Sequence, residues 1–233
     1  MADKLSRCAM CLVKSQAKRC RSLEGQAPPG CPTLNQTEAL EQARIQYCQP
    51  RIREFARQAA LQEAECYLNR DQKPLVRFPV KPRLQEIIEF ANRLGYHRLG
   101  LAFCVGLHGE SHQTARILEM HGFEVVSVCC KVGAVPKEEI GINDWEKVTV
   151  GEYESMCNPI AQAEILNRAG TEFNILLGLC VGHDSLFIKH ATAMTTVFAV
   201  KDRVLGHNPL AALYTANSYY ERLLKARAER DRE

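Results

Sequence analysis

The sequence lacks the patterns that mark several large classes of protein. It contains no G-x-G-x-x-G fingerprint and no GxxxxGK[ST] phosphate loop, so nothing supports a dinucleotide or ATP as cofactor. Aromatic residues make up 7% of the chain and tryptophan occurs once, which leaves no platform for stacking nucleic-acid bases. The formal net charge of +3 is also too small to indicate nucleic acid as the main partner.

Long apolar runs are absent as well. The longest, such as residues 175–182, fall far short of the roughly 20 apolar residues that span a bilayer, so we expect no membrane partner. The N-terminus carries no apolar stretch of the length that a secretory signal needs. With 46% hydrophobic and 24% charged residues, the composition is that of an ordinary soluble domain. We therefore expect a cytoplasmic, reducing location.

Cysteine is the residue that the sequence has in excess. The chain contains 11 cysteines, an odd number that would leave one thiol over in a framework of disulfides. In a reducing compartment, clustered cysteines indicate metal or redox chemistry more often than structural disulfides. The positions of the thiols are therefore the best guide to function.

Residues 1–34 differ from the rest of the chain and predict a small Cys-rich metal-binding module. Several Gly and Pro residues interrupt this stretch, and it holds too little apolar material for a core, so a bound metal is the simplest way to order it. Its thiols follow the pattern C-x2-C-x8-C-x10-C-P and belong to Cys8, Cys11, Cys20 and Cys31. The first pair has the spacing of metal ligands, whereas the second pair of a zinc ribbon is missing. Unligated redox thiols are the alternative.

The remaining chain divides into a helical connector and an α/β domain. Residues 35–81 are expected to form helices that pack on the main domain, with Pro50 opening the second helix. Residues 82–233 alternate between the two kinds of element: helices are expected at 82–94, 110–121, 159–169, 184–190 and 210–228, and strands at 99–104, 123–130, 173–180 and 195–201. Strands that are apolar on both faces and alternate with helices predict an α/β fold. We expect a mostly parallel sheet with helices on both faces, as in Rossmann-like three-layer proteins.

Thiols collect where the predicted strands end. Cys104, Cys130 and Cys180 each close a strand, with Cys129 beside Cys130, and Cys157 precedes the start of a helix. Ligands of open α/β sheets bind beyond the carboxyl ends of the strands, so we expect these thiols on one rim. Sulfur ligands suit zinc and iron–sulfur clusters, and a set of three would leave one metal position open. The alternatives are buried thiols that only pack, or a metal-free nucleophile at Cys157, where a helix N-terminus would lower the pKa.

Polar residues near the same rim are candidates for binding substrate or moving protons. Gly182 allows a close approach of a ligand after the third strand, and free N–H groups there favour an anion or a cluster sulfide. The candidate catalytic residues are Glu110, His183, Asp184, Lys201, Asp202 and Arg203. Capping residues and surface ion pairs are the alternative for each of them.

Several segments resemble a prokaryotic Cys-rich family of unknown function that is labelled only "metal-binding protein". They are FCVGL (103–107), SVCCKVG (127–133), MCNPIAQAEILN (156–167), GLCVGHDSLF (178–187) and VKDRVLGHNPLAALY (200–214). The resemblance implies metal binding, and its ligands would be Cys8, Cys11, Cys20, Cys31, Cys104, Cys130, Cys157 and Cys180. The thiols at the edge of α/β layers are also similar to those of quinolinate synthase and thiouracil desulfidase, which hold a [4Fe-4S] cluster with one open iron.

These observations lead to one main hypothesis and two rivals. The main hypothesis is an iron–sulfur enzyme acting on a small polar substrate, a lyase, desulfidase or oxidoreductase. Its [4Fe-4S] cluster would bind Cys130, Cys157 and Cys180, with Cys104 as a fourth ligand or close neighbour. The N-terminal module would hold a second cluster, for exchange with an electron-transfer partner, or a structural zinc. The rivals are a non-catalytic zinc protein and a metal-free thiol-redox enzyme. The sequence does not indicate an oligomeric state.

Overall fold

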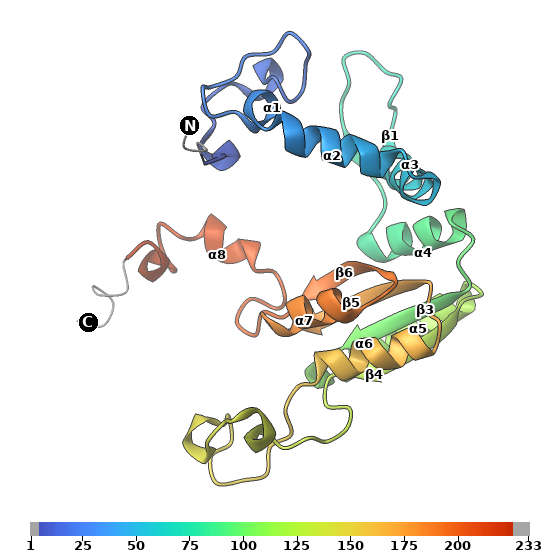
Figure 1. The fold of residues 1–233 in the computed structure, drawn as a ribbon, viewed down its shortest axis with the longest axis vertical. Coiled ribbons are helices and arrows are strands. Elements are labelled where there is room, and N and C mark those ends of the chain that lie inside the picture. Colours follow the sequence, from blue (N-terminus) through green and yellow to red (C-terminus); the bar gives the residue numbers. More distant parts are fainter. Residues whose placement is uncertain (1–4, 226–233) are drawn as a thin grey trace. The chain divides into compact units, whose positions relative to one another are not determined.

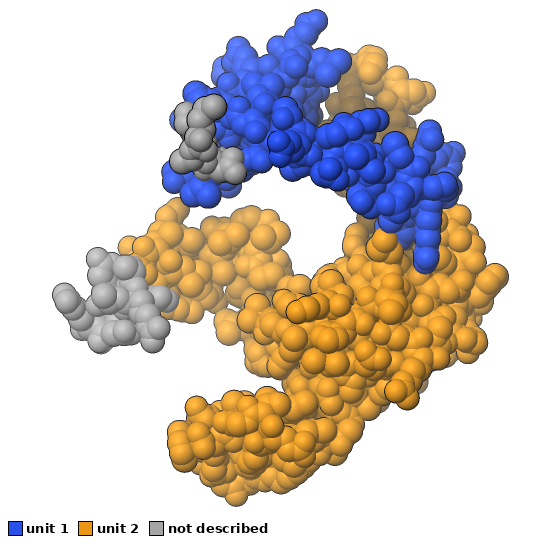
Figure 2. Space-filling view, in the orientation of Figure 1, with its two compact units in different colours: residues 1–65 blue, residues 66–233 orange. Residues whose placement is uncertain are grey.

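The computed structural model describes residues 5–225, and the chain falls into two compact units (Figure 2). Unit 1 comprises residues 1–65 and unit 2 comprises residues 66–233. The finer division into residues 1–34, 35–81 and 82–233 stays a prediction.

Unit 1 consists of short irregular turns followed by helices. Its first part contains two 3-10 turns, Cys8–Met10 and Ser15–Ala17, and a backbone bridge between Lys18 and Gln26. The bridge requires glycine at position 25, since a Cβ there would lie 2.5 Å from the carbonyl carbon of Lys18. Three helices follow: α1 (Pro32–Asn35), α2 (Thr37–Tyr47) and α3 (Pro50–Glu65). The predicted opening of a helix at Pro50 is confirmed.

Unit 2 begins with a small antiparallel pair that the sequence does not predict. β1 (Tyr67–Leu68) pairs with β2 (Phe78–Pro79) inside the segment expected to be helical. Strands of two residues are too short to show the alternation that identifies a strand. The helix α4 (Arg83–Arg93) then leads into the main sheet.

The main sheet has four parallel strands in the order β4-β3-β5-β6. The strands are β3 (Arg98–Phe103), β4 (Glu124–Cys129), β5 (Phe173–Leu179) and β6 (Met194–Val200). The helices between them are α5 (His108–Met120), α6 (Pro159–Arg168) and α7 (His183–His190) (Figure 1). The predicted α/β fold is confirmed, and the strand order reverses direction between β3 and β5.

Helices flank the sheet, and the strands bury side chains on both faces. Leu176 of β5 packs in one core cluster with Ala163 of α6 and Phe187 of α7. Its strand neighbour Phe173 points the other way and lies 5.5 Å, centroid to centroid, from Phe90 of α4. Because successive side chains of a strand alternate between faces, α6 and α7 cover one face and α4 covers the other.

Two segments depart from this layered arrangement. The chain between β4 and α6 leaves the sheet and forms a separate lobe with two 3-10 turns, Lys137–Ile140 and Asp144–Glu146 (Figure 1). Near the C-terminus, α8 covers only Leu210–Tyr214, so the helix predicted for residues 210–228 is wrong over most of its length; residues 226–228 lie outside the described part.

The early end of α8 has a local cause in the polar residues that follow it. The Thr215 hydroxyl donates to the Ala211 carbonyl, and the Ser218 backbone donates to the Thr215 carbonyl in a turn. Such side chains compete with helical hydrogen bonds. Within residues 5–225, each helix is too short or too polar to cross a bilayer.

Candidate functional site

The ends of β3 and β4 bring two thiols together. Phe103 and Cys129 are register partners in the parallel sheet, so the next residues, Cys104 and Cys130, leave the sheet side by side. The Cys104 N–H donates to the Leu177 carbonyl at 3.1 Å, and the Cys130 N–H donates to the Phe103 carbonyl at 2.8 Å. Both thiols are buried. The sheet's own hydrogen bonds therefore fix their positions.

A third thiol arrives from the start of α6. The Asn158 N–H donates to the Cys130 carbonyl at 2.7 Å, which holds the adjacent Cys157 against the end of β4. The Asn158 side chain also caps α6 by accepting from the Ala161 N–H at 3.1 Å. One asparagine thus sets both the helix start and the position of Cys157, whose side chain is half-buried.

The three thiols form a chain of contacts with Cys130 in the middle. Cys130 makes side-chain hydrogen bonds with both Cys104 and Cys157. Its Sγ also accepts from the Val105 N–H at 3.3 Å. The predicted convergence of Cys104, Cys130 and Cys157 is therefore present in the fold, and we call these three residues the thiol site.

The contacts divide the thiol site into two acidic thiols and one weakly acidic thiol. The hydrogen bond from Cys130, with help from the Gly106 N–H and the Lys201 ammonium, lowers the pKa of Cys104 to about 5. The hydrogen bond from Cys130, and then the charges of Lys131 and His183, lower the pKa of Cys157 to about 6. The pKa of Cys130 is raised, because its proton is shared with these two thiolates. Cys130 is therefore the proton donor of the site, and the Cys104 and Cys157 sulfur atoms are the ones that its hydrogen bonds stabilise.

Two cations from the end of β6 reach the thiols. The Lys201 N–H donates to the Leu179 carbonyl at 3.1 Å, and its ammonium hydrogen-bonds the Cys104 thiol. Arg203 Nη2 donates to the Sγ of Cys180 at 3.1 Å, and this contact raises the pKa of Arg203. Cys180 follows β5 and is half-buried. The Cys180 thiol, also predicted to be a ligand, is thus hydrogen-bonded by the Arg203 guanidinium. It follows β5, whereas Cys104 follows the adjacent strand β3.

The predicted carboxylates serve the backbone near them. Asp202 accepts from the N–H groups of Val204 and Leu205, at 3.0 and 2.8 Å, and so closes its own turn. Asp184 accepts from the Ser185 N–H at 2.7 Å in the first turn of α7.

The remaining predicted residues lie close to the rim. His183 begins α7 directly after Gly182, whose φ of +85° is one that glycine adopts easily. The charge of His183 helps to lower the pKa of Cys157. Glu110 is exposed in the first turn of α5. The catalytic and substrate-binding roles of these residues, and of the carboxylates, stay predictions.

Two residues that sequence reasoning missed support the thiol site. Gln162 is fully buried, and its Nε2 donates to the carbonyls of Phe103 and Val128, which joins the ends of β3 and β4. Its position on the inner side of an otherwise apolar helix face was the available signal. Lys131 was detectable as a cation directly after Cys130; it donates to the Ser155 carbonyl and acts on Cys157.

In unit 1, the four predicted cysteines share one cavity of about 500 Å³. The lining includes the thiol-bearing residues Cys8, Cys11, Cys20 and Cys31 and the cations Arg7, Lys18 and Arg19. The fold therefore gathers the cysteines that the spacing grouped.

Metal binding itself is not shown. In the part of the chain that the structure describes, no group of three or more His, Cys, Asp or Glu side chains is arranged to hold a metal ion.

Comparison with known proteins identifies relatives without an assigned reaction. A family model described as "Protein of unknown function (DUF1847)" matches residues 31–198. The uncharacterized protein MJ0455 of Methanocaldococcus jannaschii is 52% identical over 147 residues, which cover 63% of this chain and 74% of the relative.

Solved structures give a much weaker likeness. A structure of Dph2 from Pyrococcus horikoshii with a 4Fe-4S cluster aligns with a TM-score of 0.26 and 20% identity, over 42% of this chain and 23% of the Dph2 chain. A second Dph2 structure from the same organism gives the same score and covers 22% of its chain. The chain thus spans less than a quarter of Dph2, and so low a score supports no inference about function.

Proposed function

The chain belongs to the DUF1847 family of unknown function, and we propose that it is an iron–sulfur protein whose thiol site binds a cluster that acts on a small polar substrate. The observation that carries the proposal is the contact chain Cys104–Cys130–Cys157 at the carboxyl edge of the sheet. These thiols come from three separate segments, and packing alone does not require sulfur in all three places.

Sulfur ligands suit an iron–sulfur cluster as well as zinc. We choose the cluster because an N–H···S hydrogen bond and two cations already surround these sulfur atoms, and such contacts are the means by which proteins hold and tune clusters.

The cations supply what a cluster ligated by thiolates requires. Lys201 contacts the Cys104 thiol and Arg203 donates to the Cys180 sulfur, so these two cations would offset the negative charge of a bound cluster. The Val105 N–H already donates to the Cys130 sulfur, and N–H···S hydrogen bonds are one means by which proteins tune clusters. An iron atom without a protein ligand would act as a Lewis acid or sulfur acceptor. His183, whose charge acts on Cys157, would then take up or release a proton of the substrate.

The cavity of unit 1 is our candidate for a second metal site. Its four thiols match the number of ligands that zinc or a cluster takes, and three cations lie among them. We assign it an iron–sulfur cluster for electron transfer; a structural zinc is the alternative.

Metal analysis of variants tests the proposal. The full-length protein is purified without oxygen, and iron, sulfide, zinc and the visible absorption spectrum are measured. Serine replaces Cys104, Cys130, Cys157 or Cys180 in a background in which the four N-terminal cysteines are serine. We expect iron and sulfide in the background protein, and at least a tenfold loss in the Cys130→Ser and Cys157→Ser variants. Cys129→Ser is the matched control, since it changes the neighbouring thiol at the same strand end. Zinc alone, or full retention of iron in all four site variants, would refute the assignment.

A metal-free thiol enzyme is the second candidate. It is favoured by one observation, the lowered pKa of Cys157, about 6, at the start of α6. This candidate predicts a metal-free protein in which Cys157 reacts far faster with alkylating agents than the rest, because Cys104, whose pKa is also lowered, is buried.

A further inference from the structure

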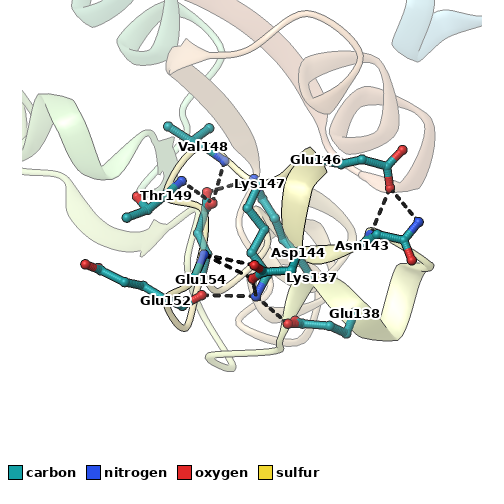
Figure 3. Close-up of polar contacts among 11 residues, drawn as sticks. Lys137, Glu138, Asn143, Asp144, Glu146, Lys147, Val148, Thr149, Glu152 and Glu154 are labelled. Atoms are coloured by element: carbon teal, nitrogen blue, oxygen red, sulfur yellow. Dashed lines mark hydrogen bonds and ion pairs between the residues drawn. The ribbon is translucent and has the colours of Figure 1, made fainter.

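The lobe of unit 2, residues 134–156, is braced by its own polar contacts (Figure 3). The nearly buried Lys147 ammonium pairs with Glu138 and with Asp144, the latter at 3.1 Å. Lys137 pairs with Glu154 at 2.7 Å, and the Glu154 carboxylate also accepts from the N–H groups of Val148 and Thr149. These contacts hold the backbone of the lobe in one conformation, so its exposed side chains have fixed positions.

The braced lobe leaves large apolar side chains in solvent. Trp145 is 73% exposed and Val148 is 86% exposed. Ile140, Val150 and Tyr153 of the same lobe are exposed as well. Large apolar residues gathered on a fixed support, rimmed by charge, mark a surface that binds another macromolecule.

The charge of the lobe is strongly negative. Residues 134–156 contain six acidic and two basic residues, a net charge of −4. The lobe begins shortly after Cys130 and ends directly before Cys157, so anything bound to it lies on the segment that joins two members of the thiol site. A basic surface with exposed apolar residues is the complementary partner.

The chain itself contains such a surface in unit 1. Residues 5–34 contain five basic residues and one acidic residue, a net charge of +4. Leu12 is 98% exposed and Leu23 is 87% exposed on this module. The two surfaces thus match in exposed apolar residues and are opposite in charge.

We propose that the lobe binds a second copy of this chain through that copy's basic N-terminal module, residues 5–34. In the proposed dimer the contact is reciprocal, with the module of each copy on the lobe of the other, which is the arrangement that closes with two-fold symmetry. The inference depends on exposed apolar side chains and on the basic residues of the module, none of which is a ligand in the proposed cysteine sites.

The single tryptophan makes the contact measurable in the full-length chain. Trp145 fluorescence quenching by acrylamide is recorded as protein concentration rises, and sedimentation velocity is measured on the same samples. We expect a monomer–dimer equilibrium, with Trp145 shielded from acrylamide as the dimer forms. High salt should weaken the dimer, because about 1 M salt shortens the Debye length to about 3 Å.

Surface variants identify the two faces. Leu12→Glu on the module and Glu139→Lys on the lobe should each raise the dimer dissociation constant at least tenfold; both residues are exposed, and Glu139 lies outside the bracing pairs described above. Met120→Glu is the matched control, since this side chain is 81% exposed at the end of α5, and it should leave the constant unchanged. A monomer with an open Trp145 at every concentration overturns the proposal. So does shielding that is independent of concentration, or a dimer that neither variant weakens.

Discussion

Replacing Gly178 with alanine should damage the fold beside the thiol site. Gly178 lies in β5, where the register with β6 shifts, and its φ is +70°. A Cβ at this position would stand 2.1 Å from Cδ1 of Leu107 and 3.9 Å from the Cβ of Cys104. The left-handed backbone costs a non-glycine residue about 1–2 kcal/mol, and overpacking adds about 1–3 kcal/mol. We therefore expect Gly178→Ala to lower the free energy of unfolding by about 2–5 kcal/mol.

The matched control is Gly95→Ala, which separates the two causes. Gly95 has a φ of +67°, but a Cβ there would meet nothing within 4 Å. This variant should therefore lose only the backbone part, about 1–2 kcal/mol. Urea unfolding measures both variants, and metal content reports whether the displaced Leu107 disturbs Cys104. If Gly178→Ala costs no more than Gly95→Ala, the assumed contact with Leu107 is wrong.

Two further predictions concern titration. In the metal-free protein, iodoacetamide should modify Cys157 readily at pH 7, with half the maximal rate near pH 6, because hydrogen bonding from Cys130 lowers its pKa to about 6; a midpoint above pH 8 would contradict this. The pKa of Glu154 is lowered to about 2, chiefly by its hydrogen bond with Lys137, so its contribution to the lobe is complete above 4.5 and is lost as the pH falls towards 2. Amide-exchange protection of Val148 and Thr149 should fall over that range, and Glu154→Gln should abolish the step; protection independent of pH would exclude this role.

The sheet could be predicted from the sequence because its strands are long and apolar. In segments such as residues 173–179 every residue is buried, so the sequence shows a continuous apolar run. The helices before β3, β4 and β5 each end at a glycine, which marks the strand boundary. The convergence of Cys104 and Cys130 also followed, since the ends of parallel strands share one edge of the sheet.

Other parts depended on contacts that a linear pattern does not contain. The two-residue strands β1 and β2 exist only through pairing with each other. Asp202 reads as a charge at a strand end, yet its carboxylate is satisfied by the turn that it closes. The sequence also does not show which cation contacts which thiol. In the structure, the segment after β6 brings Arg203 to Cys180 and Lys201 to Cys104.

The reversal of strand order has a consequence for synthesis of the chain on the ribosome. β5 inserts beside β3, although α5, β4, the lobe and α6 are translated between them. The Cys104 N–H finds its acceptor, the Leu177 carbonyl, only after that later strand has emerged. The Cys104 thiol is therefore synthesised 53 residues before Cys157 and 73 residues before Leu177, and the thiol site can assemble only after that later segment has left the ribosome.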